Sequence, residues 1–240
     1  MKIIDAVWEK RNLGMDTVEF ELSGEESLDQ IKEALKENEK QYNVVKVPYY
    51  SYDTFKLLSE FGYVYSENLF HLTHNLRLNL SPIQKRISDS ITYSLMDESD
   101  IAQLNSEINK QMFSTDRIAL NPSFGIKTSN IRYMNWISDE IQKGTDIYKM
   151  VYKDQSVGFF GYKKVAEDVY FPFLAGMYKD YISSGLGIGI VTKPIEESQR
   201  RKAKMNSTYV SSNNSNTLTL HISLGFQIKD VNCVFSKINN

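Results

Sequence analysis

The chain has a single cysteine, no surplus of basic residues and no long apolar run. The one cysteine, Cys233, excludes an intramolecular disulfide, and its apolar surroundings predict a small core residue. With 28 basic and 30 acidic residues the net charge is −2, which argues against nucleic acid as a partner. No apolar run approaches the ~20 residues that span a bilayer, and charged residues interrupt the N-terminus, so no membrane span or signal peptide is expected. We therefore expect a cytoplasmic protein without nucleic-acid or membrane partners.

Residues 1–75 alternate between strand and helix patterns. Apolar runs predict strands at 3–7, 17–22, 42–47 and 63–75, with helices at 26–39 and 52–60. Residues 76–95 are polar and contain Ser81-Pro82, which predicts a linker. We expect one domain at residues 1–80 and a second at 81–240.

The second half begins with predicted helices at 97–112 and 131–143. An antiparallel meander of strands at 147–152, 156–165 and 169–177 follows, with turn residues between them. A helix at 186–204, a strand at 207–210, a helix ending at Leu224 and a strand at 231–235 complete the order.

The segment between the strand at 169–177 and the next helix is the most informative part of the chain. It contains Ser183 and Ser184, and its glycines are spaced as Gly185-x-Gly187-x-Gly189. Small residues leave backbone N–H groups unobstructed, and the dipole of the following helix favours negative charge at this point. The segment therefore predicts a turn that binds a phosphate group, although glycines also end strands and let helices pack closely.

The elements after this turn resemble motifs A and B of the Gcn5-related N-acetyltransferases. In that family a turn with two small residues holds the pyrophosphate of acetyl-CoA, and an Asn precedes a helix that ends in Gly-Phe. Gly185 and Gly187 match the two small positions, Asn214 matches the Asn, and Gly225-Phe226 matches the helix end. The resemblance implies an α/β fold, in which helices flank a mixed, mostly antiparallel central sheet, with a partial subdomain of the same kind at the N-terminus.

The resemblance also implies how acetyl-CoA is bound. In the family the strand before the turn pairs with the pantetheine arm, and its N–H groups hold the thioester oxygen. Ile182 stands where the family has Arg or Gln, so the backbone and the serine hydroxyls must provide the phosphate donors. The residues implied to bind the cofactor are Leu174, Ala175, Gly176, Met177, Ser183, Ser184, Gly185, Leu186, Gly187 and Asn214.

His221 is the candidate catalytic residue. It occupies the position at which many family members have a Tyr that protonates the departing CoA thiolate. An imidazole with an ordinary pKa near 6.5 suits a general acid at neutral pH. The alternative, of equal weight, is a half-buried helix residue bonded to a backbone carbonyl. No metal site is predicted, because His71 and His74 face opposite ways on a strand.

The first 75 residues share one local pattern with the C-terminal half. Residues 58–63 place a helix end before Gly62 and an aromatic residue, as residues 220–226 do before Gly225. They are interpreted as a truncated copy of that half that lacks the phosphate-binding turn. An N-terminal partial repeat is typical of the family branch that includes TDP-fucosamine acetyltransferase, whose members acetylate nucleotide-linked amino sugars and are often homodimers.

Short matches to that branch suggest residues that bind the acceptor. Arg117, in a loop, could pair with the diphosphate of a nucleotide sugar, and Tyr133 with Trp136 could stack on a sugar or base. A helical aromatic stripe is more often part of a core, so both interpretations stay open. The general base is also open among Glu167, Asp168 and Asp180. Three functions therefore remain: a sugar-nucleotide N-acetyltransferase, an acetyltransferase for another small or peptidic amine, and an inert acyl-CoA-binding module.

Overall fold

The computed structural model describes residues 1–239, which form two compact units. Unit 1 contains residues 1–70, 211–213 and the chain from Asp230 onward. Unit 2 contains His71–Val210 and Asn214–Lys229. The expected division into domains at 1–80 and 81–240 stays a prediction.

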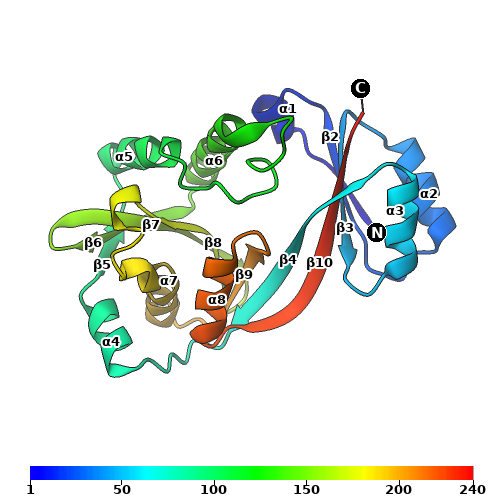
Figure 1. The fold of residues 1–240 in the computed structure, drawn as a ribbon. Helices are drawn as coiled ribbons and strands as arrows, with labels where there is room; N and C mark the ends of the chain where they lie inside the picture. The colour runs from blue at the N-terminus through cyan, green and yellow to red at the C-terminus, as the bar shows by residue number, and fades with distance from the viewer. Residues whose placement is uncertain (240) are drawn as a thin grey trace. The chain divides into compact units, whose positions relative to one another are not determined.

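Unit 1 is a sheet with two helices packed on one face (Figure 1). Its strands follow the order β1-β2-β3-β10-β4, and β2 pairs with β3 in parallel from Thr17↔Tyr42 to Glu21↔Lys46. The elements are β1 (Lys2–Asp5), α1 (Trp8–Leu13), β2 (Thr17–Glu21), α2 (Leu28–Glu37), β3 (Tyr42–Pro48), α3 (Tyr52–Glu60), the first part of β4 (Val64–His74) and most of β10 (Gln227–Ile238).

The core of unit 1 lies between its sheet and helices α2 and α3. Ile31 from α2 and Leu58 from α3 are buried against strand residues such as Phe20, Val45 and Phe235. Helix α2 begins with a capping box, in which the Ser27 and Gln30 side chains each bond the other's backbone N–H. The apolar stripe of each helix thus meets the apolar face of the sheet.

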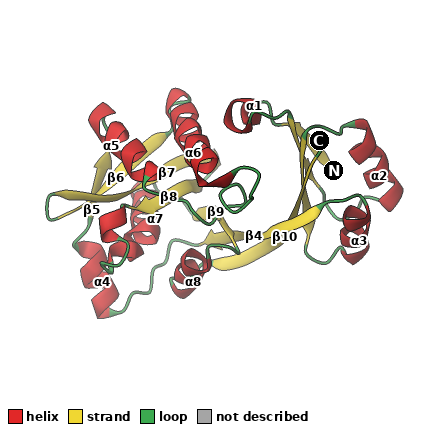
Figure 2. Ribbon diagram, turned by 45° about the horizontal axis from the view of Figure 1, so that its top comes forward, coloured by secondary structure: helices red, strands yellow, loops and turns green. Residues whose placement is uncertain are grey.

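Unit 2 has helices on both faces of its sheet (Figures 1 and 2). Its strands follow the order β10-β4-β9-β8-β7-β6-β5, so β4 lies between β9 and β10. The elements are the end of β4, α4 (Pro82–Asp89), β5 (Thr92–Leu95), α5 (Glu98–Asn109), α6 (Gly125–Gln142), β6 (Asp146–Tyr152), β7 (Gln155–Ala166), β8 (Val169–Met177), the 3-10 helices η1 (Lys179–Tyr181) and η2 (Leu186–Ile188), α7 (Gly189–Arg200), β9 (Met205–Ser211) and α8 (Ser215–Ser223).

Two hydrophobic clusters fix the helices of unit 2 to the sheet. Leu104 and Ile108 of α5 and Ile137 of α6 pack on one face, with Phe159 and Phe173. On the other face, Leu186 and the α7 residue Ile190 pack against Phe160, Tyr162 and Met177. The strand pairs β2–β3 and β8–β9 are parallel, whereas β1–β2, β3–β10, β5–β6, β6–β7 and β7–β8 are antiparallel. The expected fold class, a mostly antiparallel mixed sheet flanked by helices, is confirmed.

The polar segment at 76–95 is not the linker that its composition predicts. Ser81 and Gln84 form a capping box that starts helix α4, and Pro82 occupies its first turn. Strand β5 then pairs with β6, from Thr92↔Val151 to Leu95↔Tyr148. Polar composition misled the prediction because both elements are short and largely exposed.

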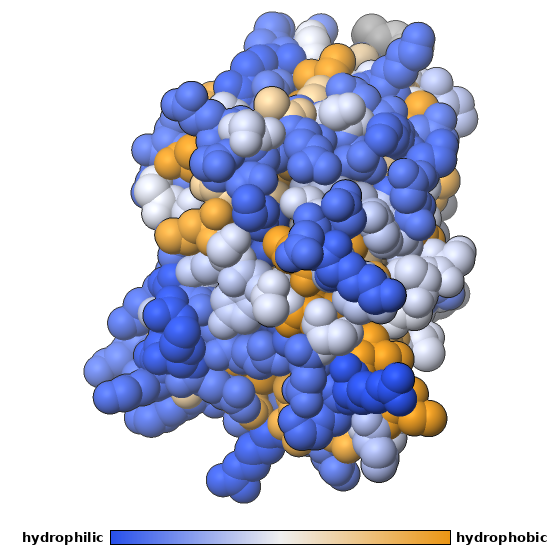
Figure 3. Space-filling view, turned by 90° about the vertical axis from the view of Figure 1, so that its left-hand side faces the viewer, coloured by the Kyte–Doolittle hydropathy of each residue, from blue (hydrophilic) through white to orange (hydrophobic). Residues whose placement is uncertain are grey.

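The surface gives little indication of partners. None of the helices within residues 1–239 has the length and apolar character that crossing a membrane requires. On the face drawn in Figure 3, apolar side chains form separate patches within a mainly hydrophilic surface. The homodimer implied by the family resemblance stays a prediction.

Candidate functional site

The segment that connects β8 to α7 contains the predicted phosphate-binding turn. Gly185 has φ of +81°, a conformation that residues with a side chain rarely adopt. A Cβ added at Gly185 or Gly187 would meet no atom within 4 Å, so packing does not explain either glycine. Gly189 is different, because a Cβ there would lie 3.0 Å from the Cδ1 of Ile91. The first two glycines leave open backbone, and the third allows α7 to pack closely.

Several backbone N–H groups of this turn lack a partner within the protein. Within residues 1–239, those of Ser183, Gly185 and Gly187 donate to no acceptor. The Ser184 hydroxyl is engaged in the turn itself, since it donates to the Tyr181 carbonyl at 2.6 Å and accepts from the Leu186 N–H at 3.2 Å. Exposed N–H groups next to the start of a helix favour an anion. The Leu186 side chain, by contrast, is buried in the core.

Ile182 gives this turn an unusual surface. Its side chain is 60% exposed and provides no hydrogen-bond donor at the position where the family resemblance expects Arg or Gln. Any phosphate recognition here therefore depends on the backbone and on Ser183, which is exposed.

Strands β8 and β9 separate shortly after they begin. They pair only at Val169↔Met205 and Tyr170↔Asn206, although both strands continue. One further bond, from the Thr208 hydroxyl to the Pro172 carbonyl at 2.9 Å, links them. Beyond Pro172, the edge of β8 that faces β9 has no strand partner within the described residues. A parted strand pair of this kind can accept an extended ligand as an added strand.

The end of β8 borders this opening. The Tyr178 N–H donates to the Val157 carbonyl of β7 at 2.9 Å, so the alternation of a strand directs the backbone groups of Met177 and Ala175 towards β9. Leu174 and Gly176 therefore face β7. Gly176 also has a packing reason to be glycine, because an added Cβ would lie 2.6 Å from the Sδ of Met112.

Helix α8 follows β9, and two predicted site residues lie at its N-cap and within it. The Asn214 side chain caps the helix by accepting from the Thr217 N–H at 3.3 Å. His221 is 8% exposed, and its Nδ1 lies 2.8 Å from the Thr217 carbonyl. Since a carbonyl can only accept, Nδ1 carries the proton and Nε2 carries the lone pair in the neutral ring. The Phe226 ring packs edge-on against it, with 4.8 Å between centroids.

Burial lowers the pKa of His221, and the hydrogen bond to Thr217 offsets this only in part. The ring is therefore neutral at pH 7, and it must gain a proton before it can act as an acid. The same geometry suits a packed helix residue, so the catalytic role stays a prediction.

The predicted acceptor residues lie on or before helix α6. Asp116 organises the loop before α6 by accepting from the Ile118 N–H at 2.6 Å and from the Ser129 hydroxyl. Arg117 is half-buried in this loop rather than fully extended into solvent. Tyr133 and Trp136 are half-buried too. The Tyr133 ring is tilted against Phe113 with 4.2 Å between ring centroids, and the Trp136 ring is tilted against Phe173 with 5.3 Å between centroids. The two aromatic rings thus belong partly to the core, and both residues stay partly exposed.

The histidines of β4 have separate partners. His74 is buried, with Nε2 donating to the Leu224 carbonyl at 3.1 Å and Nδ1 accepting from the Leu76 N–H at 2.9 Å. His71 is half-exposed, and its Nε2 lies 2.7 Å from the Ser207 hydroxyl of β9. Residues 1–239 contain no group of His, Cys, Asp and Glu that could hold a metal ion. Sequence reasoning missed the His71–Ser207 pair, because 136 residues separate its members.

The carboxylates considered as general bases lie at surface turns. Asp168 forms an ion pair with Lys204 at 2.7 Å, and a hydrogen bond from that lysine lowers its pKa. Glu167 and Asp180 are exposed. None of the three is shown to act as a base.

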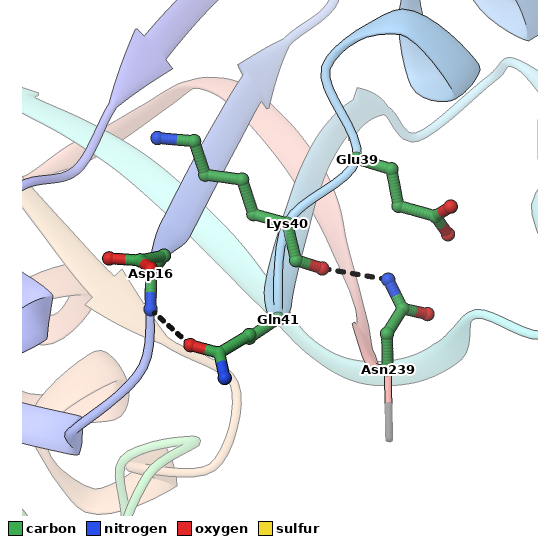
Figure 4. Close-up of a pocket in the computed structure, with 5 residues that line it drawn as sticks. All are labelled: Asp16, Glu39, Lys40, Gln41 and Asn239. Carbon is green, nitrogen blue, oxygen red and sulfur yellow. Dashed lines mark hydrogen bonds between the residues drawn. The ribbon is translucent and has the colours of Figure 1, made fainter.

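A shallow depression of about 670 Å³ in unit 1 contains none of the predicted site residues (Figure 4). It is lined by Asp16, Glu39, Lys40, Gln41 and Asn239. Its charged side chains are already paired with neighbours, such as Glu39 with Lys237 at 2.8 Å. Hydrogen bonds from Asp16 N–H to Gln41 and from Asn239 to the Lys40 carbonyl hold its walls. No unsatisfied group marks it as a reactive site.

Comparison with known proteins identifies the fold. The sequence matches no family model and no curated protein. The structure is similar to a Gcn5-related N-acetyltransferase from Sphaerobacter thermophilus, with a TM-score of 0.58 and 13% identity over 82% of this chain and 59% of that one. The chain has the fold of the Gcn5-related N-acetyltransferases.

Two further structures extend the comparison. A Gcn5-related glucosamine N-acetyltransferase region of a fungal multi-domain β-N-acetylglucosaminidase gives a TM-score of 0.63 at 12% identity, over 87% of this chain and 27% of that one. A tandem protein of the same fold from the clavulanic acid biosynthesis pathway gives 0.54 at 10% identity, over 87% of this chain and 67% of that one. The chain spans less than two thirds of the first of these three neighbours and about a quarter of the second. At such low identity the likeness concerns the fold alone.

Proposed function

We propose that the protein transfers an acetyl group from acetyl-CoA to a primary amine. The observation that carries this proposal is the parting of β8 and β9 beside a turn whose N–H groups at Ser183, Gly185 and Gly187 have no acceptor within residues 1–239. An extended thioester with a pyrophosphate at one end has the shape and charge that these two features accept. The shared fold with known N-acetyltransferases supports the same function.

The residues present fit acetyl-CoA as the donor. The N–H groups of Ser183, Gly185 and Gly187 would hold the pyrophosphate, aided by the positive end of α7. The backbone of Ala175 and Met177 would pair with the pantetheine arm along the opening. When bound, the donor supplies an activated acetyl group as a thioester.

In this proposal the chain contributes proximity and electrostatic stabilisation. The β8 N–H groups that face the opening stabilise the oxyanion that develops when the amine attacks. Asn214 fixes the start of α8, and His221 is the proposed proton donor to the leaving thiolate. A thiolate is a stable leaving group, with an ordinary thiol pKa near 8.5, so this last step needs little assistance.

An amino sugar, free or linked to a nucleotide, is the acceptor we propose to test first. Support comes from the similarity to a glucosamine N-acetyltransferase region and from the aromatic surface of Tyr133 and Trp136. Arg117 is the proposed contact for a sugar-linked diphosphate. Another small or peptidic amine is the second candidate, and an inert acyl-CoA-binding module is the third, favoured only by Ile182.

Thermal unfolding with and without acetyl-CoA tests the donor, with ADP-ribose as a nucleotide control. A ligand at about a hundred times its dissociation constant adds about 2.7 kcal/mol, which raises the melting temperature by several degrees for a chain of this size. A rise with acetyl-CoA alone supports the proposal, and release of free CoA with glucosamine or TDP-linked amino sugars then identifies the acceptor. No rise with either ligand contradicts donor binding.

A further inference from the structure

The His71–Ser207 pair lies where β8 and β9 begin to separate. Ser207 directly follows Asn206, the last β9 residue paired with β8. Its hydroxyl lies 2.7 Å from the Nε2 of His71 on the neighbouring strand β4. Both residues belong to unit 2, as does the opening beside them.

The pair lies on the half-exposed face of these strands. Along β9, Asn206 and Thr208 are buried, and Asn206 accepts from the Ser198 hydroxyl of α7. Ser207 and Tyr209 alternate with them and so face the opposite side. The Tyr209 ring stacks on His71 with 4.6 Å between centroids and is 46% exposed.

A row of aromatic rings connects this pair to the predicted acceptor residues. The ring centroids of Tyr209 and Phe171, a β8 residue, are 6.1 Å apart. Phe173 lies two residues further along β8, and its ring centroid is 5.3 Å from that of Trp136. The Trp136 and Tyr133 centroids are 6.3 Å apart. The imidazole therefore lies at one end of a row of aromatic rings, partly buried at Phe173, that runs from α6 to β4 on the face of the sheet that α6 covers.

His71 is the histidine whose environment suits proton transfer with a substrate. His74 and His221 are both buried, whereas His71 is half-exposed and its Nε2 lies 2.7 Å from the Ser207 hydroxyl. We propose that His71, acting through the Ser207 hydroxyl, is the general base that deprotonates the acceptor amine. This inference rests on the proposed acetyl transfer and adds the base that the sequence left open.

The proton steps balance as follows. The acceptor ammonium gives one proton to Ser207, which passes its own to Nε2 of His71, and the amine lone pair attacks the thioester carbon. The C–N bond forms, the C–S bond breaks, and the second proton passes from nitrogen through His221 to the thiolate. The products are the acetamide, CoA as a thiol and one proton, which His71 releases to solvent.

Two variants test whether His71 acts as a general base or only packs as a ring. His71→Phe keeps a ring to stack on Tyr209 but cannot accept a proton, and His71→Ala leaves space for added imidazole. General-base catalysis contributes at least about a hundredfold, so we expect the turnover of either variant to fall by about that factor while the dissociation constant for acetyl-CoA changes less than about twofold. Imidazole should restore part of the rate in His71→Ala and none in His71→Phe.

The assay uses glucosamine, a short peptide with a free amino terminus, and water as acceptors, because slow hydrolysis of acetyl-CoA needs the same base. Wild-type turnover in His71→Phe, or a loss in His71→Ala that imidazole does not relieve, overturns the role of His71. Failure of the wild type to bind acetyl-CoA overturns the proposed function instead, together with this inference.

Discussion

The two units contain the same succession of strand, helix, strand, helix and strand, but only one of them has an opening. In unit 1 the parallel strands β2 and β3 stay paired from Thr17↔Tyr42 to Glu21↔Lys46. In unit 2 the corresponding strands β8 and β9 part after Tyr170↔Asn206. Strand pairing therefore closes in unit 1 the space that stays open between the corresponding strands of unit 2.

The turn before α2 in unit 1 and the turn before α7 in unit 2 also differ, because among the described residues only the first binds an anion from the chain itself. Before α2, the Glu26 carboxylate accepts from the N–H groups of Ser23 and Gly24, at 3.0 Å each. Burial raises the pKa of Glu26, but hydrogen bonds from the chain's amino terminus and Ser23 outweigh this and lower it to about 2. The chain thus places its own anion at this turn in unit 1, whereas in unit 2 the Ser183 and Gly185 N–H groups have no acceptor within residues 1–239.

The C-terminal ends of α3 in unit 1 and α8 in unit 2, by contrast, are nearly identical. Tyr63 N–H donates to the Leu58 carbonyl at 2.9 Å, and Phe226 N–H donates to the His221 carbonyl at 3.1 Å. The glycine before each aromatic residue has a positive φ, +80° at Gly62 and +96° at Gly225. This match agrees with the interpretation of the N-terminal half as a truncated copy, which stays a prediction.

The largest expected effect concerns a buried charge on α7, because the acidic residues of the corresponding helix α2, which are Asp29, Glu33 and Glu37, are all exposed. Glu197 of α7 is fully buried, and burial raises its pKa, but hydrogen bonds from Arg200, Arg201 and Tyr148 outweigh this and lower it to about 2. Its folded pKa lies below the unfolded value of 4.5, so its stabilisation is present above pH 4.5 and is lost as the pH falls towards 2. Over this pH window, protonation of Glu197 should lower the free energy of unfolding of the wild type by on the order of 3 kcal/mol.

Urea unfolding of the wild type and of Glu197→Gln at several pH values between 7 and 3 measures this loss. The variant should be less stable at neutral pH, and its stability should vary less with pH. Glu26 and the other carboxyl groups with lowered pKa, such as Glu140, provide the remaining slope. An equal pH dependence in both proteins would show that Glu197 does not carry the effect.

Local patterns in the sequence were sufficient for most elements and for the position of the glycine-rich turn, whose phosphate-binding role stays a prediction. Alternating apolar residues located β6, β7 and β8, and glycine spacing located the turn, because strand periodicity and positive φ are local properties. Helix α4 was not predicted, although Ser81 and Gln84 have the spacing of a capping box. The polar composition of the segment was given more weight than this pattern.

The strand order and the partners of side chains could not be predicted. Nothing local to β4 indicates that it lies between β9 and β10, and so nothing brings Ser207 next to His71. The separation of β8 from β9 could not be predicted either, because it depends on how two strands pair that are separated in the chain by helix α7. For Gly176, the sequence indicated a close approach but not that Met112 makes it.

The second prediction tests whether the turn in unit 2 alone binds the donor. Gly185→Val should weaken acetyl-CoA binding about 30- to 100-fold, because φ of +81° disfavours a side chain and the loss of a charged hydrogen bond or two costs roughly 2–3 kcal/mol. Isothermal titration calorimetry measures the affinity.

Gly24→Ala in unit 1 is the matched control. Its φ of +87° and the Tyr50 hydroxyl 3.0 Å from the new Cβ should reduce stability while leaving the affinity unchanged. Equal affinity in Gly185→Val and the wild type would contradict the assignment of the turn.

The smallest expected effect concerns His221, whose counterpart at the other helix end is Leu58. Leucine is fully buried at that position in unit 1, so His221→Leu should preserve the helix end and the melting temperature. We expect turnover to fall by no more than about tenfold at unchanged acetyl-CoA affinity, because a thiolate leaves readily without a strong acid. Steady-state kinetics with a binding measurement on the same variant separates the two quantities. An unchanged rate would give His221 the same packing role as Leu58, and the remaining catalytic difference between the copies would then lie in the opening and the His71–Ser207 pair.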